Sequence, residues 1–288
     1  MPAALALLAA AFFAAALVTT QFGLRHMDGL AGAKISIPST GLLFSLLLPL
    51  SGVDVFGGWN IQGASVFIAL GVFFPVAVTL LAYEANRRMG PTIAGAIGGT
   101  APLFAVLGAV LFLGEKLGLA QFTATLAIVA GSTVLLWRGG AGGKILSSAT
   151  WLSWCAAALR ALAQVIAKYG LLLWPNPYAT LLLGYAVSTV VVWSVGAFSR
   201  RAESRVYTRR GMAWFAVTGA FNGSALLALY TALNSSGGTV SIVSPIAATY
   251  PMFTLVLNAI ILREERLTAR LIGGVALMVS GVVVLLVL

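Results

Sequence analysis

The chain has 288 residues, of which 17 are Lys or Arg and 7 are Asp or Glu, so its formal net charge is +10. Only 8% of the residues are charged and 60% are hydrophobic, with a mean hydropathy of +1.01. Soluble domains average roughly 25% charged and 45–50% apolar residues. The composition therefore excludes a water-soluble globular protein and a disordered chain, and the single cysteine excludes an internal disulfide. The class of protein that fits this composition is a polytopic membrane protein.

Charged residues divide the chain into apolar stretches about as long as a membrane-spanning helix. Such a helix needs about 20 residues, because a rise of ~1.5 Å per residue must cover roughly 30 Å of hydrocarbon. The longest stretch, Gly211–Leu262, contains 52 uncharged residues and divides into two helices at the turn-type run 234–238. The expected spans are Ala3–Thr20, Ile35–Val53, Gly63–Tyr83, Thr92–Leu113, Leu117–Trp137, Ser147–Tyr169, Pro177–Phe198, the two within Gly211–Leu262, and Leu267–Leu288.

The first apolar stretch is expected to be a membrane helix and not a cleaved signal peptide. No Lys or Arg precedes it, so the positive leading region of a signal peptide is missing. The predicted fold is therefore all-α, with ten transmembrane helices.

An internal repeat relates the two halves of the chain. The segment from Gly99, GTAPLFAVLGAVLFLGEKL, resembles the segment from Ala248, ATYPMFTLVLNAIILREERL. The two prolines, Pro102 and Pro251, align and are expected to kink their helices. Upstream, Tyr83 aligns with Tyr230, and the pattern Gln-x3-Arg that begins at Gln21 recurs as Gln-x3-Lys at Gln164. We expect two five-helix units, residues 1–140 and 145–288.

Because five is odd, the second unit must enter the membrane from the opposite side. The cations test this inversion independently, since Lys and Arg accumulate in short cytoplasmic loops. Fourteen of the 17 lie in the odd-numbered loops; the others are Lys116, Lys168 and Arg160. This bias predicts cytoplasmic odd loops and both termini outside. Inverted repeats favour a carrier, because two such halves can rock about a central site.

The repeated motif also resembles a known family. Ala101, Pro102 and Phe104, followed by Leu-Gly-Glu ending at Glu115, recur in part as Pro251, Phe253 and Glu264. This pattern is similar to the EamA family of the drug/metabolite transporter superfamily. The resemblance implies export of amino acids or other small metabolites through a central cavity lined mainly by helices 1, 3, 4, 6, 8 and 9.

Two features depart from that family. Its members usually have cytoplasmic termini, whereas the cation bias here predicts the reverse. The small multidrug relatives use a membrane-embedded glutamate in helix 1, and helix 1 here contains no acidic residue. Proton antiport of that type therefore has no chemical basis in this helix.

Arg160 is the sharpest candidate for solute binding. An arginine near the middle of a span costs about 2.5–3.5 kcal/mol on insertion scales and usually faces protein or a wet cavity. Arg160, Gln164 and Lys168 share one helix face at i, i+4 and i+8. An unpaired guanidinium suits bidentate capture of a carboxylate or phosphate. The alternative is structural, with Arg160 bound to backbone carbonyls or reaching toward an interface.

Further polar residues complete the predicted substrate site. Gln21 and Gln164 occupy equivalent places in the two halves, which makes them candidates for the cavity lining; the alternative is interhelical hydrogen bonding. Asn222, Tyr230 and Tyr250 could orient a ligand, although tyrosine at a span end is often an interfacial anchor. The predicted substrate-binding set is Arg160, Gln164, Gln21, Asn222, Tyr230 and Tyr250.

The sequence offers little support for an enzyme. His26 is the only histidine, no His/Cys/Asp cluster is suited to a metal, and no glycine-rich phosphate loop occurs. We expect no catalytic residue, metal or cofactor, and no nucleic-acid partner, because the cations lie between apolar runs. The expected partners are a small-molecule solute and the lipid bilayer, and the oligomeric state, a monomer included, stays open.

The sequence therefore predicts a carrier in the plasma (inner) membrane that works by alternating access, above all for efflux of an amino acid or related metabolite. An organic-anion exchanger that uses Arg160 is the alternative within transport. A non-transporting scaffold or receptor is the alternative outside it.

Overall fold

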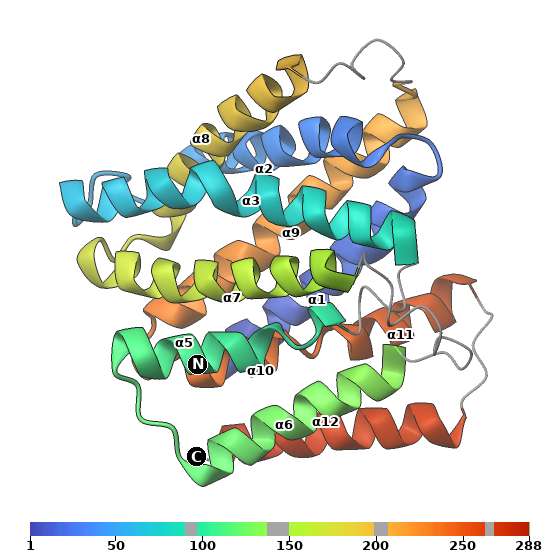
Figure 1. Cartoon of the computed structure of the whole chain (residues 1–288). Coiled ribbons are helices and arrows are strands. Elements are labelled where there is room, and N and C mark those ends of the chain that lie inside the picture. Colours follow the sequence, from blue (N-terminus) through green and yellow to red (C-terminus); the bar gives the residue numbers. More distant parts are fainter. Residues whose placement is uncertain (90–96, 137–149, 199–206, 263–267, 288) are drawn as a thin grey trace.

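The computed structural model describes residues 1–89, 97–136, 150–198, 207–262 and 268–287, and this part of the chain is helical with short connections (Figure 1). The first half contains α1 (Pro2–Leu24), α2 (Gly29–Ser51), α3 (Ile61–Met89), α5 (Ala101–Leu113) and α6 (Leu119–Leu136). The second half contains α7 (Thr150–Leu173), α8 (Pro177–Phe198), α9 (Arg209–Asn234), α10 (Val240–Ala247), α11 (Tyr250–Leu262) and α12 (Ala269–Val287).

These helices confirm the ten predicted spans. Seven helices are individually long and apolar enough to cross a bilayer, and Val240–Leu257, which joins α10 to part of α11, is an eighth such segment. Two shorter apolar helices, Ala101–Leu113 and Leu119–Leu135, supply the fourth and fifth spans. The ninth span is thus two helices, α10 and α11, separated by a turn.

Two helices extend past the charges that delimit the predicted stretches. α2 begins at Gly29, six residues before the predicted Ile35, because the Asp28 carboxylate accepts a hydrogen bond from the Ala31 amide at 2.8 Å and caps the helix. α3 continues beyond Glu84, which forms an i,i+4 ion pair with Arg88 at 2.6 Å. The charges that delimit the predicted stretches therefore do not mark the ends of these two helices.

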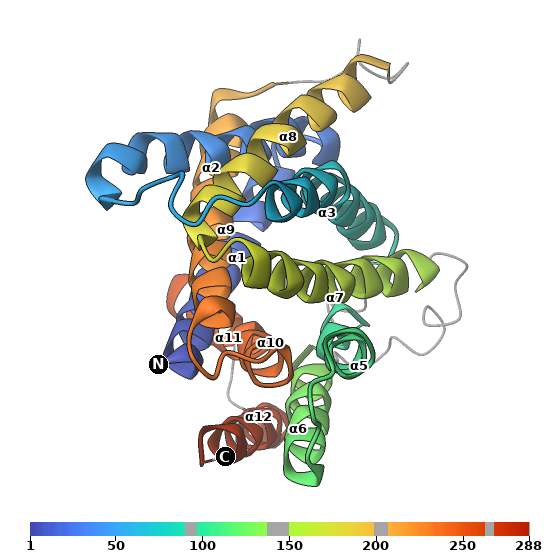
Figure 2. The ribbon, with the colours of Figure 1, turned by 90° about the vertical axis from the view of Figure 1, so that its left-hand side faces the viewer.

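The packing of the helices follows the predicted inverted repeat. α1 packs mainly on α9, and its repeat counterpart α7 packs on α3, the counterpart of α9. In the same way α1 contacts α11 while α7 contacts α5, and α2 contacts α9 while α8 contacts α3. α6 pairs with its own counterpart, α12, beside the main body (Figure 2). Exchanging the two halves thus preserves the pattern of helix contacts.

The bundle has two ends, which we name by the termini. The terminal face is the end at which α1 begins and α12 ends, and it carries the connections 52–60, 114–118, 174–176 and 235–239 (Figure 1). The opposite face is the end at which α1 ends and α12 begins. On the terminal face, the Trp174 indole donates to the Gly57 carbonyl at 3.1 Å, and the Asn176 amide donates to the Asp54 carbonyl at 2.8 Å.

Close contact between the halves depends on glycines where α2 crosses α9. A Cβ atom at Gly219 would lie 2.3 Å from the Ser36 carbonyl oxygen, and the Gly219 carbonyl accepts a hydrogen bond from Thr40 Oγ1 at 2.6 Å. Small residues let helix backbones approach in this way in membranes. A side chain at this position must therefore push α2 and α9 apart.

We expect Gly219→Ala to destabilise the protein by about 1–3 kcal/mol, the usual cost of overpacking. The matched control is Gly273→Ala on α12, where a Cβ would meet nothing within 4 Å. Thermal unfolding of the purified protein in detergent should show a Tm lower by several degrees for Gly219→Ala and unchanged for Gly273→Ala. Equal Tm values for the two variants would contradict the close approach of α2 and α9.

Candidate functional site

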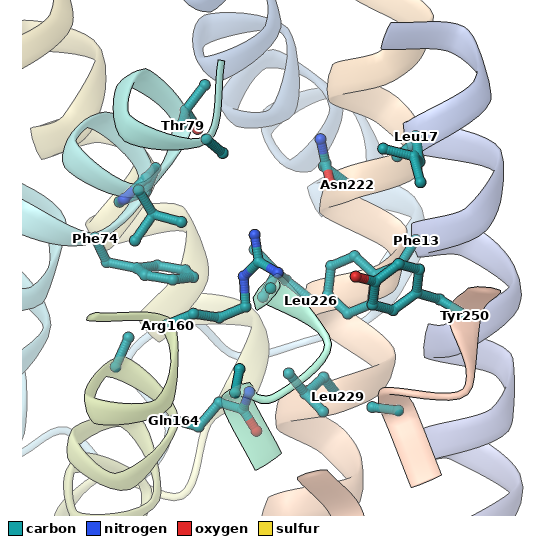
Figure 3. Close-up of a pocket in the computed structure, with 18 of the residues that line it drawn as sticks. Phe13, Leu17, Phe74, Thr79, Arg160, Gln164, Asn222, Leu226, Leu229 and Tyr250 are labelled. Atoms are coloured by element: carbon teal, nitrogen blue, oxygen red, sulfur yellow. The ribbon is translucent and has the colours of Figure 1, made fainter. Parts of the chain in front are cut away.

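A cavity of about 230 Å³ lies between the two halves. Its wall combines aromatic and aliphatic side chains with a few polar groups, as in small-molecule sites generally (Figure 3). The lining residues used below are Phe13, Thr20, Phe74, Thr79, Tyr83, Pro102, Arg160, Gln164, Tyr185, Asn222, Tyr230, Ser244 and Tyr250.

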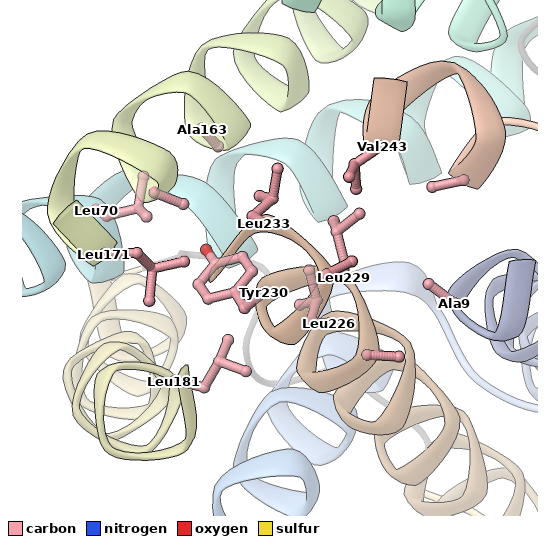
Figure 4. Close-up of a cluster of buried hydrophobic side chains, with 14 of the residues drawn as sticks. Ala9, Leu70, Ala163, Leu171, Leu181, Leu226, Leu229, Tyr230, Leu233 and Val243 are labelled. Atoms are coloured by element: carbon pink, nitrogen blue, oxygen red, sulfur yellow. The ribbon is translucent and has the colours of Figure 1, made fainter. Parts of the chain in front are cut away.

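On the helices of the first half the cavity extends toward the opposite face, whereas on α9 its lining continues to Tyr230, near the end of that helix at the terminal face. Its lining residues on α1 begin only at Phe13, and on α3 they begin at Phe74 and continue to Tyr83, near the end of that helix on the opposite face. Toward the terminal face the helices form a close-packed layer that includes Ala9, Leu171, Leu233 and Val243, each at most 2% exposed (Figure 4). This layer separates the cavity from the terminal face.

Two interrupted spans contribute backbone to the cavity wall. Turns precede α5 and α11, and Pro102 and Pro251 are the second residue of each helix, a position where the missing N–H does no harm. The hydroxyls of Thr100 and Thr249 donate to the carbonyls of Ile97 and Ile246 at 2.6 and 2.7 Å. The two turns therefore satisfy backbone oxygens in the same way in both halves. The sequence predicted that Pro102 and Pro251 kink their helices, but each proline instead lies in the first turn of a separate helix that begins after the turn.

Arg160 is the charged residue of the cavity. It projects from α7 into the space bordered across the cavity by Phe13, Asn222 and Tyr250 (Figure 3). Among the described residues, no hydrogen-bond or ion-pair partner contacts its guanidinium. None of the described residues that line the cavity is acidic. The site therefore presents one uncompensated positive charge, which favours an anionic group on a ligand.

Two polar atoms at the cavity wall lack partners within the described part of the protein. They are Oε1 of Gln164, one turn from Arg160 on α7, and Oγ of Ser244 on α10. A buried polar group without a partner costs about 1–3 kcal/mol. These atoms would gain from a ligand or a rearrangement that supplied hydrogen bonds.

The structure brings together five of the six residues predicted from the sequence. Arg160, Gln164, Asn222, Tyr230 and Tyr250 line the same cavity, whereas Gln21 does not. On α1 the adjacent residue, Thr20, reaches the cavity instead. The halves therefore differ at this pair of equivalent glutamines.

The sequence interpretation missed several aromatic lining residues. They are Phe13, Phe74, Tyr83 and Tyr185. Tyr83 could have been found, because it aligns with Tyr230 in the internal repeat, and both line the cavity. No comparable signal distinguishes Phe13 or Phe74 from the other apolar residues of their helices.

The chemistry available at the cavity is binding. It offers a fixed cation, amide and hydroxyl groups, and aromatic faces. Among the described residues, no group of three or more His, Cys, Asp and Glu side chains could hold a metal ion.

The positive charge of Arg160 should be measurable inside the cavity. In a Cys155→Ser background, a Thr79→Cys reporter should react several-fold faster with a negatively charged methanethiosulfonate than with a positively charged one of similar size, because a fixed charge in a low-dielectric cleft concentrates counter-ions. Adding Arg160→Met should remove most of that preference. An unchanged preference would show that Arg160 does not set the potential of the cavity.

Comparisons with known proteins agree with this architecture. Residues 1–137 and 147–287 match the EamA-like transporter family. A comparison with curated proteins finds no match. Among solved structures 29 chains match. One of them, described as "Crystal structure of protein", is 19% identical with a TM-score of 0.74 and covers 98% of this chain and 94% of that chain, a likeness of fold alone. The chain therefore belongs to the EamA-like transporter family, within the drug/metabolite transporter superfamily, and is a multi-pass membrane protein.

Proposed function

We propose that the protein exports a small organic metabolite that carries a carboxylate, such as an amino acid or a related compound, by alternating access of the central cavity. The two units 1–140 and 145–288 are the halves that move against each other. The observation that carries the proposal is the free guanidinium of Arg160 in a cavity whose described lining contains no acidic side chain.

The chemistry of the wall supports a solute of mixed character. Arg160 can bind a carboxylate through two parallel N–H···O bonds. Asn222 and the tyrosines can accept or donate further hydrogen bonds, and Phe13 and Phe74 can contact an apolar body. An ammonium group on the solute would contact neutral oxygen atoms and aromatic faces of the cavity wall.

The orientation of the protein in the membrane is part of the same proposal. With 14 of the 17 cations in the odd-numbered loops, the opposite face is cytoplasmic and both termini lie outside a plasma (inner) membrane. The cavity, which the buried layer separates from the terminal face, would then load from the cytoplasm, as an exporter requires.

Exchange of organic anions is the second candidate. It is favoured by the same uncompensated charge, because a pure carboxylate needs no negative partner in the site. Flux of amino acids, organic acids and organic cations into proteoliposomes, with and without a pH gradient, distinguishes the two. Failure of every carboxylate-bearing solute to move would contradict both.

Replacing Arg160 should impair transport selectively. For Arg160→Met we expect the flux of carboxylate solutes to fall about tenfold or more, because a charge-assisted hydrogen bond contributes about 1.5–3 kcal/mol. Arg160→Lys should retain part of the flux, since an ammonium binds as a single point charge.

The control variant is Arg210→Met, which removes an exposed cation at the start of α9, outside the cavity. It should transport at the wild-type rate. If Arg160→Met carries carboxylate solutes as fast as this control, Arg160 has a structural role and the proposed solute class is wrong.

A further inference from the structure

A polar cluster joins the two halves at the terminal face. We call it the clasp, and it consists of Glu115, Lys168, Leu233, Gly238, Val240 and Ser241. Its first part is the carboxylate of Glu115, which follows α5 in the first half and contacts the start of α10 in the second. It accepts hydrogen bonds from the Val240 amide at 2.8 Å, the Ser241 amide at 2.9 Å and the Ser241 hydroxyl at 2.7 Å.

This contact has a clear local cause. Gly114 ends α5 in the left-handed conformation, with φ of +67°, and turns the chain so that Glu115 leaves the helix axis. The first amides of a helix have no partner within the helix, and its N-terminus attracts negative charge. Glu115 supplies both an acceptor and a charge. The Leu-Gly-Glu motif thereby fastens α10 to the α5–α6 turn.

Lys168 forms the second part of the clasp. Its ammonium donates to the Leu233 carbonyl at 2.5 Å and to the Gly238 carbonyl at 2.8 Å, at the end of α9 and in the following connection. These carbonyls are acceptors left free where α9 ends, and a cation is favourable there. The α9–α10 connection is thus held from both sides.

The equivalent position at the opposite face carries a different cation. In the internal repeat, Lys168 aligns with Arg25. Arg25 is exposed and stacks over the Phe22 ring at 5.2 Å, and no hydrogen bond or ion pair holds it among the described residues. The acidic counterparts of Glu115, which are Glu264 or Glu265, lie outside the described residues. Among the described residues, Lys168 is therefore hydrogen-bonded, whereas Arg25 only contacts an aromatic ring.

The clasp is also connected to the cavity through its own helices. Lys168 lies two turns, about 12 Å, beyond Arg160 along α7. α10, whose first residues bind Glu115, carries the cavity residue Ser244 one turn further on. A movement of α10 or of the end of α7 must alter the cavity wall.

We propose that the clasp is the closed gate of the terminal face, and that the transport cycle must open it to release solute there. The close-packed layer of Ala9, Leu171, Leu233 and Val243 lies at the same end of the bundle as this gate, and the cavity extends away from both. In this assignment Lys168 is a gating residue and not a solute ligand, although it shares a helix face with Arg160. The inference rests on the proposed alternating access, but its test does not require transport.

The test measures from which side the cavity can be reached. The reporter is Thr79→Cys in a Cys155→Ser background, in intact cells and in inverted membrane vesicles, labelled with a membrane-impermeant maleimide. With the wild-type gate, the Thr79→Cys reporter should be labelled readily from the opposite face and slowly from the terminal face. Glu115→Gln should raise the terminal-face rate about tenfold, because it weakens the charge-assisted hydrogen bonds that join the two halves. Lys168→Met should raise the rate as well, because Lys168 holds the α9–α10 connection next to the amides that Glu115 binds.

The matched control is Arg25→Met, which removes the aligned cation from the opposite face and should not raise terminal-face labelling. Ser241→Ala, which removes only the hydroxyl bond to Glu115, should give a smaller increase than Glu115→Gln. A thermal unfolding temperature in detergent close to that of the wild type shows for each variant that the protein is folded.

The proposal is overturned if Glu115→Gln and Lys168→Met label at the wild-type rate from the terminal face. It is equally overturned if Arg25→Met raises that rate as much, which would indicate general loosening. Flux in proteoliposomes separates the two proposals. If the variants change the labelling rate as expected but the protein transports none of the tested solutes, the proposed function is wrong and the gate proposal is not affected.

Discussion

A backbone within hydrocarbon must satisfy its polar groups internally, and irregular segments are tolerated only where protein or a cavity surrounds them. The rest of this structure depends on how the two interrupted spans meet that constraint. At both breaks a threonine hydroxyl binds the carbonyl three residues earlier, and a proline two residues after the threonine removes an amide that would otherwise need a partner. Both breaks border the cavity. The interruptions thus create a polar-lined space at the centre of a bundle whose outer surface is apolar.

That space makes Arg160 tolerable at the middle of α7. A guanidinium in lipid is costly, whereas one that faces a wet cavity can keep its hydration or exchange it for a ligand. The wall around it is mainly aromatic and aliphatic and, within the described residues, free of carboxylates. Its charge is therefore available to a solute. The same helix ends in the terminal-face layer, where Lys168 meets carbonyl groups. One helix thus carries two cations with different surroundings, separated by depth in the membrane.

Most of the architecture could be predicted from the sequence because it follows from local physics. Span lengths follow from bilayer thickness, the inversion from an odd repeat, and the position of Arg160 from the cost of a buried charge. The residues of the candidate site were harder to predict. The alignment of Tyr83 with Tyr230 contained a usable signal, but symmetry misled at Gln21, where Thr20 reaches the cavity instead. The contact of Glu115 with α10 could not be predicted, because its partners are backbone amides 125 and 126 residues away in the sequence. Backbone groups carry no sequence signature.

An inverted repeat also constrains the energetics of the proposed cycle. If the halves were identical, exchanging their conformations would turn a bundle closed at one face into a bundle closed at the other with the same contacts and the same free energy. The balance between the two states therefore depends on the positions at which the halves differ, and a few kcal/mol is enough to set it. Lys168 against Arg25 and the unequal placement of Gln164 and Gln21 are such positions. In the proposed cycle, the departures from symmetry would set which state is more stable, whereas the symmetry itself would provide two equivalent states.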